Sequence, residues 1–358
     1  MKVVNINAGQ ETGGALTHLI FMAQVLKEHN IDNVLLVFEE GTISKAAREL
    51  GLAYKVINQK NTSEWINYLN ENNFDLVQTH GPRANFLVTL HRKNIHVPHI
   101  VTVHSDPRYD FLGGGIKGNI QSKLNVWSLK HSDGLFVVSS ELKDELTKLG
   151  INSNRIVQIN NAMTFSNDVR PKENHQFMQM IIVARLHPVK EHARLIKALS
   201  EVKNDHIFLN IVGDGELRES LEQLVDQYEL NHQVEFYGAL KSSEINELYR
   251  KMDLALIVSK SEGFPLVFLE AANNAVPVLM TELSATHLVI PDEEHGIAVD
   301  NSLEGIKSGI EKAYSFGIEQ LSEMGLKNRK YAIDHFGPES FYKQMKNGYD
   351  LFSKKENL

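Results

Sequence analysis

Two glutamates flank a Gly-Phe-Pro turn in the stretch SKSEGFPLVFLEAANNAVPVLM, residues 259–280. An apolar run precedes it, so Glu262 follows a buried strand and Glu270 lies eight positions further on. Pro265 suits the first position of a helix, because its missing N–H costs nothing there. Such a helix aims its free amides at whatever Glu262 faces and places Glu270 ~7–8 Å further along its axis. Carboxylates accept hydrogen bonds from sugar hydroxyls, so the spacing suits a diphosphate flanked by two sugars.

A pair of cations follows a second strand, in VARLHPVKEHARLIKAL, residues 183–199. Arg185 and Lys190 bracket a turn at Pro188 and lead into a helix. The planar guanidinium of an arginine can donate two parallel hydrogen bonds, and the ammonium of a lysine is a compact charge on a flexible side chain. Near a helix N-terminus the two together suit a diphosphate. Two isolated surface cations would explain the same residues. The glutamate pattern in the same half of the chain favours a binding site.

Glycines stand after two more strands. Gly13 and Gly14 precede a helix that we expect to begin near Ala15, and Gly213 lies in the turn VGDGEL, residues 212–217. Glycines before a helix allow a phosphate or sugar to approach exposed backbone N–H groups. Tight turns use glycine as well, so for these loops both interpretations stay open.

Short apolar runs alternate with amphipathic segments along the chain. The predicted strands form a first series at 2–8, 33–39, 75–80, 99–105, 134–139 and 155–160, and a second series at 178–186, 207–215, 234–239, 254–259 and 276–282. Near-continuous apolar strands between helices predict parallel sheets that are covered on both faces. We therefore expect an α/β protein with two doubly wound domains, joined near the polar, turn-rich segment 160–176.

Composition limits the class of protein. The 358 residues, 42% hydrophobic and 23% charged, predict two globular domains of ordinary size. The absence of cysteine excludes disulfides and thiolate metal sites and fits a reducing compartment. The N-terminus runs into a strand without a signal peptide's apolar stretch, and no window approaches the ~18 apolar residues of a membrane span. We expect a cytoplasmic protein that is at most peripheral on a membrane.

Charge is unevenly distributed between the two halves. Residues 1–160 hold 16 basic and 15 acidic side chains, net +1, which leaves 21 and 30, net −9, for residues 161–358. The chain has no basic domain, which argues against a nucleic-acid binder. The first half is the side better suited to an anionic surface, although an ordinary solvated face also explains its basic residues, among them Arg108, Lys117, Lys123 and Lys130.

The stretch from 259 to 279 resembles the signature of the retaining glycosyltransferases of family 4, which have the GT-B fold. The resemblance extends over nearly the whole chain, through the segments TGGALTHL, VPHIVTVHS, SDGLFVVSSELKDEL, VARLHPVKEHARLIKAL, VEFYGAL and YAIDHFGPESFYKQMKNGYDLF in the same order. It implies two Rossmann-like domains facing across a cleft. We expect an acceptor-side domain at 1–165, a donor-side domain at 166–335, and a C-terminal helix at 336–358 that returns to the first domain.

The resemblance also implies roles for individual residues. The reacting centre would comprise His104, Arg185, Lys190 and Glu262. His104 is expected beside the donor sugar, although a lone histidine at a strand end is more often a core residue. His80 and Arg108 are candidates for the acceptor side. The donor would be bound by Gly13, Gly14, Gly213, Gly238, Ala239, Leu240, Gly263, Phe264, Pro265, Leu266 and Glu270.

The implied reaction transfers a sugar, with retention of configuration, from a nucleotide-sugar co-substrate to a hydroxyl. The expected donor is a UDP-linked hexose or N-acetylhexosamine, and the expected acceptor is a glycan, lipid-linked or protein-linked, as in bacterial cell-surface glycan synthesis. No metal or other cofactor is expected, because the Arg–Lys pair would fill the role of a metal ion. The absence of an Asp-x-Asp motif agrees with this expectation. A non-catalytic GT-B subunit that stabilises a partner transferase, and a sugar-nucleotide epimerase, remain as alternatives.

Three positions depart from the family pattern. The usual Asn-Gly at the domain join is Asn161-Ala162, and Ala275 replaces a glycine before the strand at 276–282. The family's Gly-Gly and following Glu are replaced by LSATHLVI, residues 283–290. The last departure concerns the loop on the donor side, and hence the choice of sugar.

Overall fold

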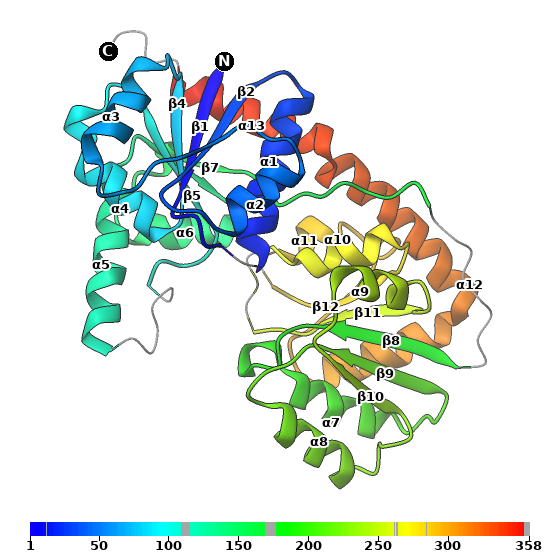
Figure 1. Ribbon diagram of the computed structural model, residues 1–358. Coiled ribbons are helices and arrows are strands. Elements are labelled where there is room, and N and C mark those ends of the chain that lie inside the picture. Colours follow the sequence, from blue (N-terminus) through cyan, green and yellow to red (C-terminus); the bar gives the residue numbers. More distant parts are fainter. Residues whose placement is uncertain are drawn as a thin grey trace. The chain divides into compact units, whose positions relative to one another are not determined.

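The computed structural model describes residues 1–11, 13–108, 115–168, 177–260, 262, 264–283 and 285–353. The chain folds into two compact units, one formed by Met1–Met163 with the segment from Pro338, and the other by Thr164–Gly337. Each unit is a parallel sheet with helices on both faces (Figure 1).

The first unit is built on a seven-stranded sheet of order β3-β2-β1-β4-β5-β6-β7, in which every neighbouring pair is parallel. Its strands are β1 (Lys2–Asn7), β2 (Asp32–Val37), β3 (Tyr54–Val56), β4 (Leu76–His80), β5 (His99–Val103), β6 (Gly134–Val137) and β7 (Ile156–Gln158). Its helices are α1 (Gly13–Glu28), α2 (Thr42–Glu49), α3 (Thr62–Glu71), α4 (Pro82–Leu90), η1 (Arg92–Asn94), α5 (Gly115–His131), α6 (Ser140–Lys148), η2 (Ser153–Arg155) and α13 (Pro338–Ser353).

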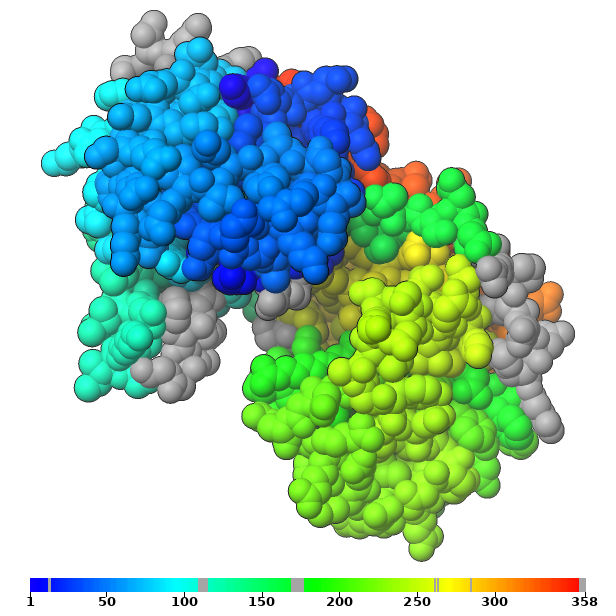
Figure 2. Space-filling model, viewed as in Figure 1, coloured from blue at the N-terminus to red at the C-terminus, as the bar shows by residue number. Residues whose placement is uncertain are grey.

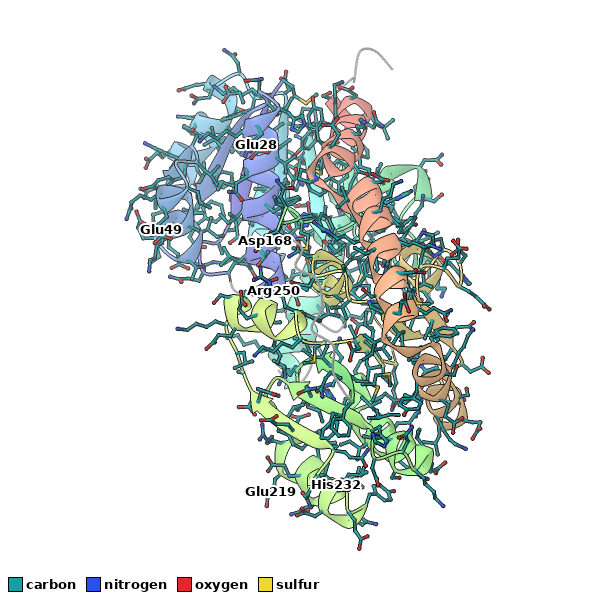
Figure 3. The ribbon with its side chains drawn as sticks, turned by 90° about the vertical axis from the view of Figure 1, so that its right-hand side faces the viewer. Glu28, Glu49, Asp168, Glu219, His232 and Arg250 are labelled. Carbon is teal, nitrogen blue, oxygen red and sulfur yellow. The ribbon has the colours of Figure 1, made fainter. Side chains whose placement is uncertain are left out.

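The second unit is built on a six-stranded parallel sheet of order β10-β9-β8-β11-β12-β13. Its strands are β8 (Met178–Val183), β9 (Ile207–Val212), β10 (Val234–Gly238), β11 (Leu254–Ile257), β12 (Val278–Thr281) and β13 (Ile297–Val299). Its helices are η3 (Pro188–Lys190), α7 (His192–Val202), α8 (Arg218–Gln227), α9 (Ser242–Tyr249), α10 (Leu266–Asn273), α11 (Thr286–Val289) and α12 (Leu303–Phe336). An ion pair of 3.3 Å between Arg250 and Asp168 ties the start of this unit to the end of α9 (Figure 3).

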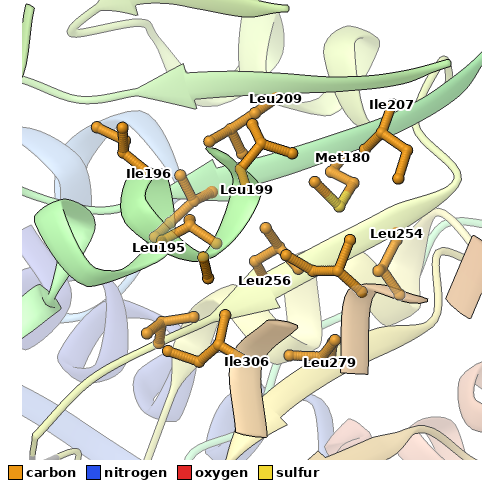
Figure 4. Close-up of a cluster of buried hydrophobic side chains, with 14 of the residues drawn as sticks. Met180, Leu195, Ile196, Leu199, Ile207, Leu209, Leu254, Leu256, Leu279 and Ile306 are labelled. Carbon is orange, nitrogen blue, oxygen red and sulfur yellow. The ribbon is translucent and has the colours of Figure 1, made fainter. Parts of the chain in front are cut away.

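Alternate strand residues make the core of the second unit. Met180, Leu209 and Leu254 lie on one face of the sheet and are fully buried against α7 and α12 (Figure 4). The opposite face carries α9, α10 and α11, because the connections that lead from β10 towards β13 cross the sheet on that side. Because both faces of the sheet are buried, the sequences of its strands are nearly continuous apolar runs.

The order of strands reverses at one place in each sheet. From β1 and β8 the chain adds strands toward one edge of each sheet, which ends at β3 or β10. It then crosses back to the middle and adds strands from β4 or β11 toward the other edge. Helices therefore leave the carboxyl ends of β1 and β4, or of β8 and β11, on opposite faces, and a crevice opens between them. Each unit has a pocket at this position.

The prediction of two doubly wound α/β units is confirmed, and all eleven predicted strands are present. Each is shorter than predicted, although β2 begins one residue before its predicted start. The two strands that the sequence did not reveal, β3 and β13, have three residues each and lie at sheet edges. A strand of three residues contains too few apolar positions for an apolar run to be recognised in the sequence. Helix α1 begins at Gly13, two residues before the predicted start at Ala15.

Ala275, where the family pattern has glycine, lies just beyond the end of α10 and has φ of 52°. This left-handed conformation costs a non-glycine residue roughly 1–2 kcal/mol. The end of a helix commonly requires it, which explains why glycine suits the position.

Helix α13 is part of the first unit and closes one face of its sheet, with Phe341, Met345 and Tyr349 buried. The Tyr349 hydroxyl donates to Gln78 Oε1 of β4 at 2.5 Å, and Gln78 Nε2 donates to Thr102 Oγ1 of β5 at 2.7 Å. A polar chain thus joins the terminal helix to the two central strands.

We predict that Tyr349→Phe destabilises the first unit by ~1–3 kcal/mol, because it leaves the buried Gln78 oxygen without its donor. Urea unfolding followed by circular dichroism measures this change. Tyr342→Phe in the same helix is the control: its ring stacks on His29 at 3.8 Å, and the variant keeps that contact. Equal midpoints for the two variants would contradict the proposed role of the hydrogen bond.

Candidate active site

The second unit has a pocket of about 310 Å³ at its switch point. Its walls are the carboxyl ends of β8 and β11, the turn before η3 and the start of α10. The sequence-predicted residues that line it are Arg185, Lys190, Glu262, Phe264, Pro265 and Leu266. Two motifs about 75 residues apart in the sequence, one basic and one acidic, therefore meet in one pocket.

Lys190 and Glu262 form an ion pair across this pocket, with Lys190 Nζ bonded to Glu262 Oε1. The Ser259 hydroxyl donates to the same carboxylate oxygen at 2.7 Å. Asn301 Nδ2 in turn donates to the Ser259 carbonyl at 3.0 Å, which fixes the end of β11. The side chains of Lys190 and Glu262 are only 27% and 14% exposed, so their charges are partly shielded from water.

A second set of contacts braces the two loops that carry the pair. The Lys260 backbone N–H donates to the Val189 carbonyl at 2.8 Å, and Lys260 Nζ lies 3.2 Å from Glu191. Arg194 approaches the other oxygen of Glu191 at 2.5 Å. Glu191 has φ of 50°, a strained conformation for glutamate that these two cations help to hold. The position of Lys190, its neighbour, is thereby fixed.

Arg185 is exposed at the mouth of the pocket, and the start of α10 faces the interior. The helix begins at Leu266, one residue later than predicted, because Pro265 is its N-cap and is extended, with φ of −75° and ψ of 102°. The free backbone N–H groups of the first turn remain at the pocket, as expected for an anion site. Gly263 lies outside the described residues.

Glu270 lies further along α10 and does not line this pocket. Burial raises the pKa of its carboxyl from 4.5 to about 7. Its charge is close enough to the buried Tyr249 hydroxyl to raise the pKa of that group, after the larger effect of burial. Within the described residues, no hydrogen-bond donor reaches the Glu270 carboxylate.

The predicted glycines of the donor side lie at the ends of β9 and β10. Gly213 has φ of 134°, and a side chain there would overlap the carbonyl of Ala184, so glycine is required. Its N–H donates to the Gly238 carbonyl at 2.8 Å, and Gly238 has φ of 71°. Ala239 is exposed, and Leu240 lines a separate open pocket with Tyr237 on β10. The 310 Å³ pocket includes none of these residues.

The first unit has a pocket of about 290 Å³ at its own switch point. Asn7 at the end of β1, His80 at the end of β4 and His104 after β5 line it, together with Glu11 and Asn125. His80 Nε2 lies 2.9 Å from Asn5 Oδ1. In the described part of the chain, His80 Nδ1 and His104 Nε2 are buried without a hydrogen-bond partner.

His104 packs between two other histidine rings, with centroids 4.8 Å from His18 and 6.2 Å from His80. Burial, with the charge of His18 as a smaller cause, lowers the pKa of His104 to about 3. Burial lowers the pKa of His18 to about 4 and holds that of His80 well below its ordinary value. All three rings are therefore neutral at pH 7, and the described residues that line this pocket include polar side chains and the acidic Glu11 but no lysine or arginine.

The remaining predicted residues of the first unit lie apart from this pocket. Gly13 and Gly14 form the first turn of α1 and so belong to the helix instead of preceding it. Arg108 pairs with Asp106 and Glu145 and does not line the pocket. These two carboxylates, hydrogen-bonded to the Arg108 guanidinium, raise its pKa.

Several residues at the pockets of the two units were not identified from the sequence. Ser259 and Glu191 are adjacent to predicted residues, but no spacing distinguishes a bracing side chain from a surface one. His18 and Asn125 belong to helices whose sequence positions give no sign that they face the strand ends. Only the packing of these helices on the sheet brings Asn125 to the pocket and His18 against His104.

The family models match both units. Residues 12–164 match the model described as Glycosyltransferase Family 4, and residues 165–331 match that described as Glycosyl transferases group 1. The chain therefore belongs to the family-4 glycosyltransferases, and the fold and family expected from the sequence are confirmed.

Individual relatives are distant. An uncharacterized glycosyltransferase of Methanocaldococcus jannaschii is 26% identical over 237 residues, 66% of this chain and 64% of that protein. The O-antigen biosynthesis glycosyltransferase WbnH of Escherichia coli is 28% identical over 220 residues, 60% of each. The chain thus spans less than two thirds of the length of these relatives. The crystal structure of Anabaena Alr3699/HepE in complex with UDP has a TM-score of 0.79 at 15% identity, with 98% of this chain and 100% of that chain covered, which shows a shared GT-B fold.

We predict that Glu270→Gln removes a pH-dependent loss of stability. The folded-state pKa of about 7 exceeds the ordinary 4.5, so the folded protein binds the proton more tightly than the unfolded chain. The free energy of unfolding therefore falls as pH rises from about 4.5 to about 7, by on the order of 3 kcal/mol. Glutamine stays neutral and avoids this loss.

Urea unfolding at pH 5 and pH 8 tests the prediction. The Glu270→Gln variant should have a higher midpoint than the wild type at pH 8 and a similar one at pH 5. Glu219→Gln, at an exposed position of α8, is the matched control and should follow the wild type (Figure 3). A midpoint difference independent of pH would contradict the raised pKa.

Proposed function

We propose that the protein is a retaining glycosyltransferase that moves a sugar from a nucleotide-sugar donor to an acceptor hydroxyl. The observation that carries this proposal is the pocket at the switch point of the second unit, where Arg185, Lys190 and the first turn of α10 surround the carboxylate of Glu262. Cations and helix amides suit the diphosphate, and a carboxylate suits the hydroxyls of the sugar attached to it.

The proposed reaction breaks the bond between the anomeric carbon and the diphosphate oxygen and forms a bond from the same face to the acceptor oxygen. The acceptor's proton passes to the departing phosphate. Negative charge grows on that phosphate in the transition state, and Lys190 and Arg185 stabilise it without rearrangement. No metal ion is required in this scheme, because the two cations and the helix amides supply the positive charge.

The donor is proposed to be a UDP-sugar, in part because the Anabaena structure of the same fold holds UDP. Glu262 would bind the transferred sugar with the Gly263–Leu266 backbone, and Glu270 the ribose. Gly213 and the segment Gly238–Leu240 would lie along the diphosphate and base, and Gly13 and Gly14 would approach the phosphate from the first unit. An ionised Glu270 accepts hydroxyl hydrogen bonds better than a protonated one, so donor binding should lower its pKa.

The acceptor is proposed to bind in the 290 Å³ pocket of the first unit. Its neutral histidines and amides offer hydrogen bonds to hydroxyl groups and no charge for an anion. A glycan suits such a lining, and WbnH, named for O-antigen biosynthesis, supports a role in cell-surface glycan synthesis. His104 would face the donor sugar, His80 would bind the acceptor, and Arg108 would contribute from outside the pocket. A lipid-linked acceptor would bring the first unit to a membrane surface.

The test is UDP release by the purified chain, with UDP-sugar and a bacterial glycan fraction as acceptor. Acceptor-dependent release of UDP supports transfer. Binding of UDP-sugar without release would identify the non-catalytic subunit, and conversion of the donor without acceptor would identify an epimerase.

We predict that Lys190→Ala and Glu262→Ala each lower the turnover number at least 100-fold and differ in nucleotide affinity. Lys190→Ala should weaken UDP binding, because it removes a charge that faces the diphosphate. Glu262→Ala should leave UDP binding unchanged or tighter, because the carboxylate no longer competes for Lys190. Calorimetric titration with UDP measures both. Wild-type turnover in either variant would contradict the assigned roles.

Exposed residues of the same charge provide matched controls: Lys197→Ala on α7 and Glu219→Ala on α8. Both should keep wild-type turnover and UDP affinity. Circular dichroism of all four variants separates loss of function from loss of fold.

A thermal-shift screen across UDP-, GDP- and ADP-sugars should show the largest rise in melting temperature with a UDP-sugar. Ligand binding stabilises the folded state by RT ln(1 + L/Kd), where L is the free donor concentration, so donor at 100 times its Kd adds ~2.7 kcal/mol. A larger shift with GDP- or ADP-sugars would overturn the assignment of the base and leave the assigned cations in place.

A further inference from the structure

Helix α5 exposes its apolar side chains to solvent. Ile116, Ile120 and Leu124 are 81%, 53% and 38% exposed. Spaced four residues apart, they form one stripe that extends ~12 Å along the helix. Trp127, half-buried against Phe86 and His131, continues the stripe. Figure 1 shows the first turns of α5 extending beyond the neighbouring α4.

The buried face of the same helix is small and polar. Gly118, Asn125 and Ser128 are buried, and Leu129 is the one large aliphatic residue among the buried positions of α5. Soluble amphipathic helices place their apolar stripe toward the core. In α5 the stripe of Ile116, Ile120 and Leu124 faces solvent instead, and only Leu124 is mostly covered by the rest of the unit.

Basic residues flank the stripe. Lys117 lies on one side of it, Lys123 and Lys130 lie on the other, and all three are exposed. The helix contains no acidic residue along its 17 positions, in a chain whose net charge is −8. Within the described residues, no carboxylate forms an ion pair with any of these lysines.

We propose that this face of α5, defined by Ile116, Ile120, Leu124 and the three lysines, docks on an anionic lipid surface. Apolar side chains that enter the acyl boundary and lysines that remain at the headgroups are the features of an interfacial helix. In the described part of the chain no helix is long and apolar enough to cross a bilayer. Docked as proposed, α5 would lie along the surface. Its surface forms the teal projection of the first unit in Figure 2.

A lipid surface fits this face better than a second copy of the chain does. A stable protein interface buries about 800 Å² on each partner, far more than three aliphatic side chains provide. Two copies of α5 in contact would also bring six lysines together with no acid on either helix to pair with them. An anionic membrane attracts every one of these lysines.

The location of α5 connects the surface with the proposed acceptor. Asn125 and Leu129, on the buried side of the helix, line the 290 Å³ pocket of the first unit. A protein docked through the opposite side would hold this pocket near the headgroups. This connection rests on the proposed function and implies an acceptor that is itself anchored in lipid, whereas docking on the membrane does not depend on transferase activity.

The test is binding of the full chain to unilamellar vesicles of phosphatidylcholine, with or without 30% phosphatidylglycerol. Trp127 borders the stripe and the chain's other tryptophan, Trp65, is fully buried, so fluorescence reports mainly on α5. We expect a blue shift and sedimentation with the anionic vesicles, at least tenfold weaker binding to the neutral ones, and release by salt.

Two double variants separate the contributions to binding. Ile116→Gln with Ile120→Gln should lower the partition coefficient on anionic vesicles at least tenfold. Lys117→Gln with Lys123→Gln should lower it about 25-fold, which is fivefold or ~1 kcal/mol per lysine. Matched controls are Leu326→Gln with Ile333→Gln, exposed aliphatic residues of α12, and Lys197→Gln, all of which should bind as the wild type does.

Equal binding by the stripe variants and their controls, or no binding of the wild type to anionic vesicles, would overturn the proposal. So would a concentration-dependent dimer, in sedimentation equilibrium, that the Ile116/Ile120 variant abolishes. The thermal shift with UDP-sugars reports on the proposed function separately, because the pocket that Lys190 and Glu262 line, on which that proposal rests, lies in the second unit. A normal shift without vesicle binding would contradict membrane docking alone.

Discussion

The ion pair between Lys190 and Glu262 is the interaction on which the donor-side site depends. It joins two loops that are 72 residues apart, and it exists because β8 and β11 are neighbours in the sheet although they are not consecutive in the chain. In the free protein each charge neutralises the other, which makes the partial burial of both tolerable. On the proposed function, a diphosphate would compete with the Glu262 carboxylate for the same ammonium group, so donor binding would also rearrange this pair.

The two pockets differ in the kind of interaction they offer. The pocket of the second unit has mobile and fixed cations beside helix amides, whereas that of the first unit is lined by histidines that burial keeps neutral. The difference follows from the side chains packed behind each strand end. In the second unit Glu262, which accepts a hydrogen bond from Ser259, pairs with Lys190, while in the first unit histidine rings surround His104 and deny it the water that a charge requires. The pocket of the second unit therefore suits an anion, whereas that of the first unit offers hydrogen bonds that suit neutral hydroxyl groups.

Helices α5 and α13 show how the same unit uses apolar residues in opposite ways. In α13, Phe341, Met345 and Tyr349 turn inward and cover the sheet. In α5 the residues Ile116, Ile120 and Leu124 turn outward, and the cost of exposing them is tolerable because α5 packs against α4 through its small side chains and Leu129. Stability alone would not select this arrangement, so the exposed stripe points to a binding role.

The sequence by itself determined the alternation of strands and helices, the division into two units and the residue types needed for a diphosphate, because buried parallel strands and glycine- or proline-bearing turns leave local patterns. The sequence did not determine how close these motifs lie to one another in the folded protein. Only the order of strands brought Lys190 to Glu262, and only helix packing brought His18 beside His104 or separated Glu270 from the pocket that Glu262 lines. Which face of α5 is buried was likewise decided by tertiary contacts, because mainly small and polar residues of this helix, and not its apolar stripe, pack against the unit.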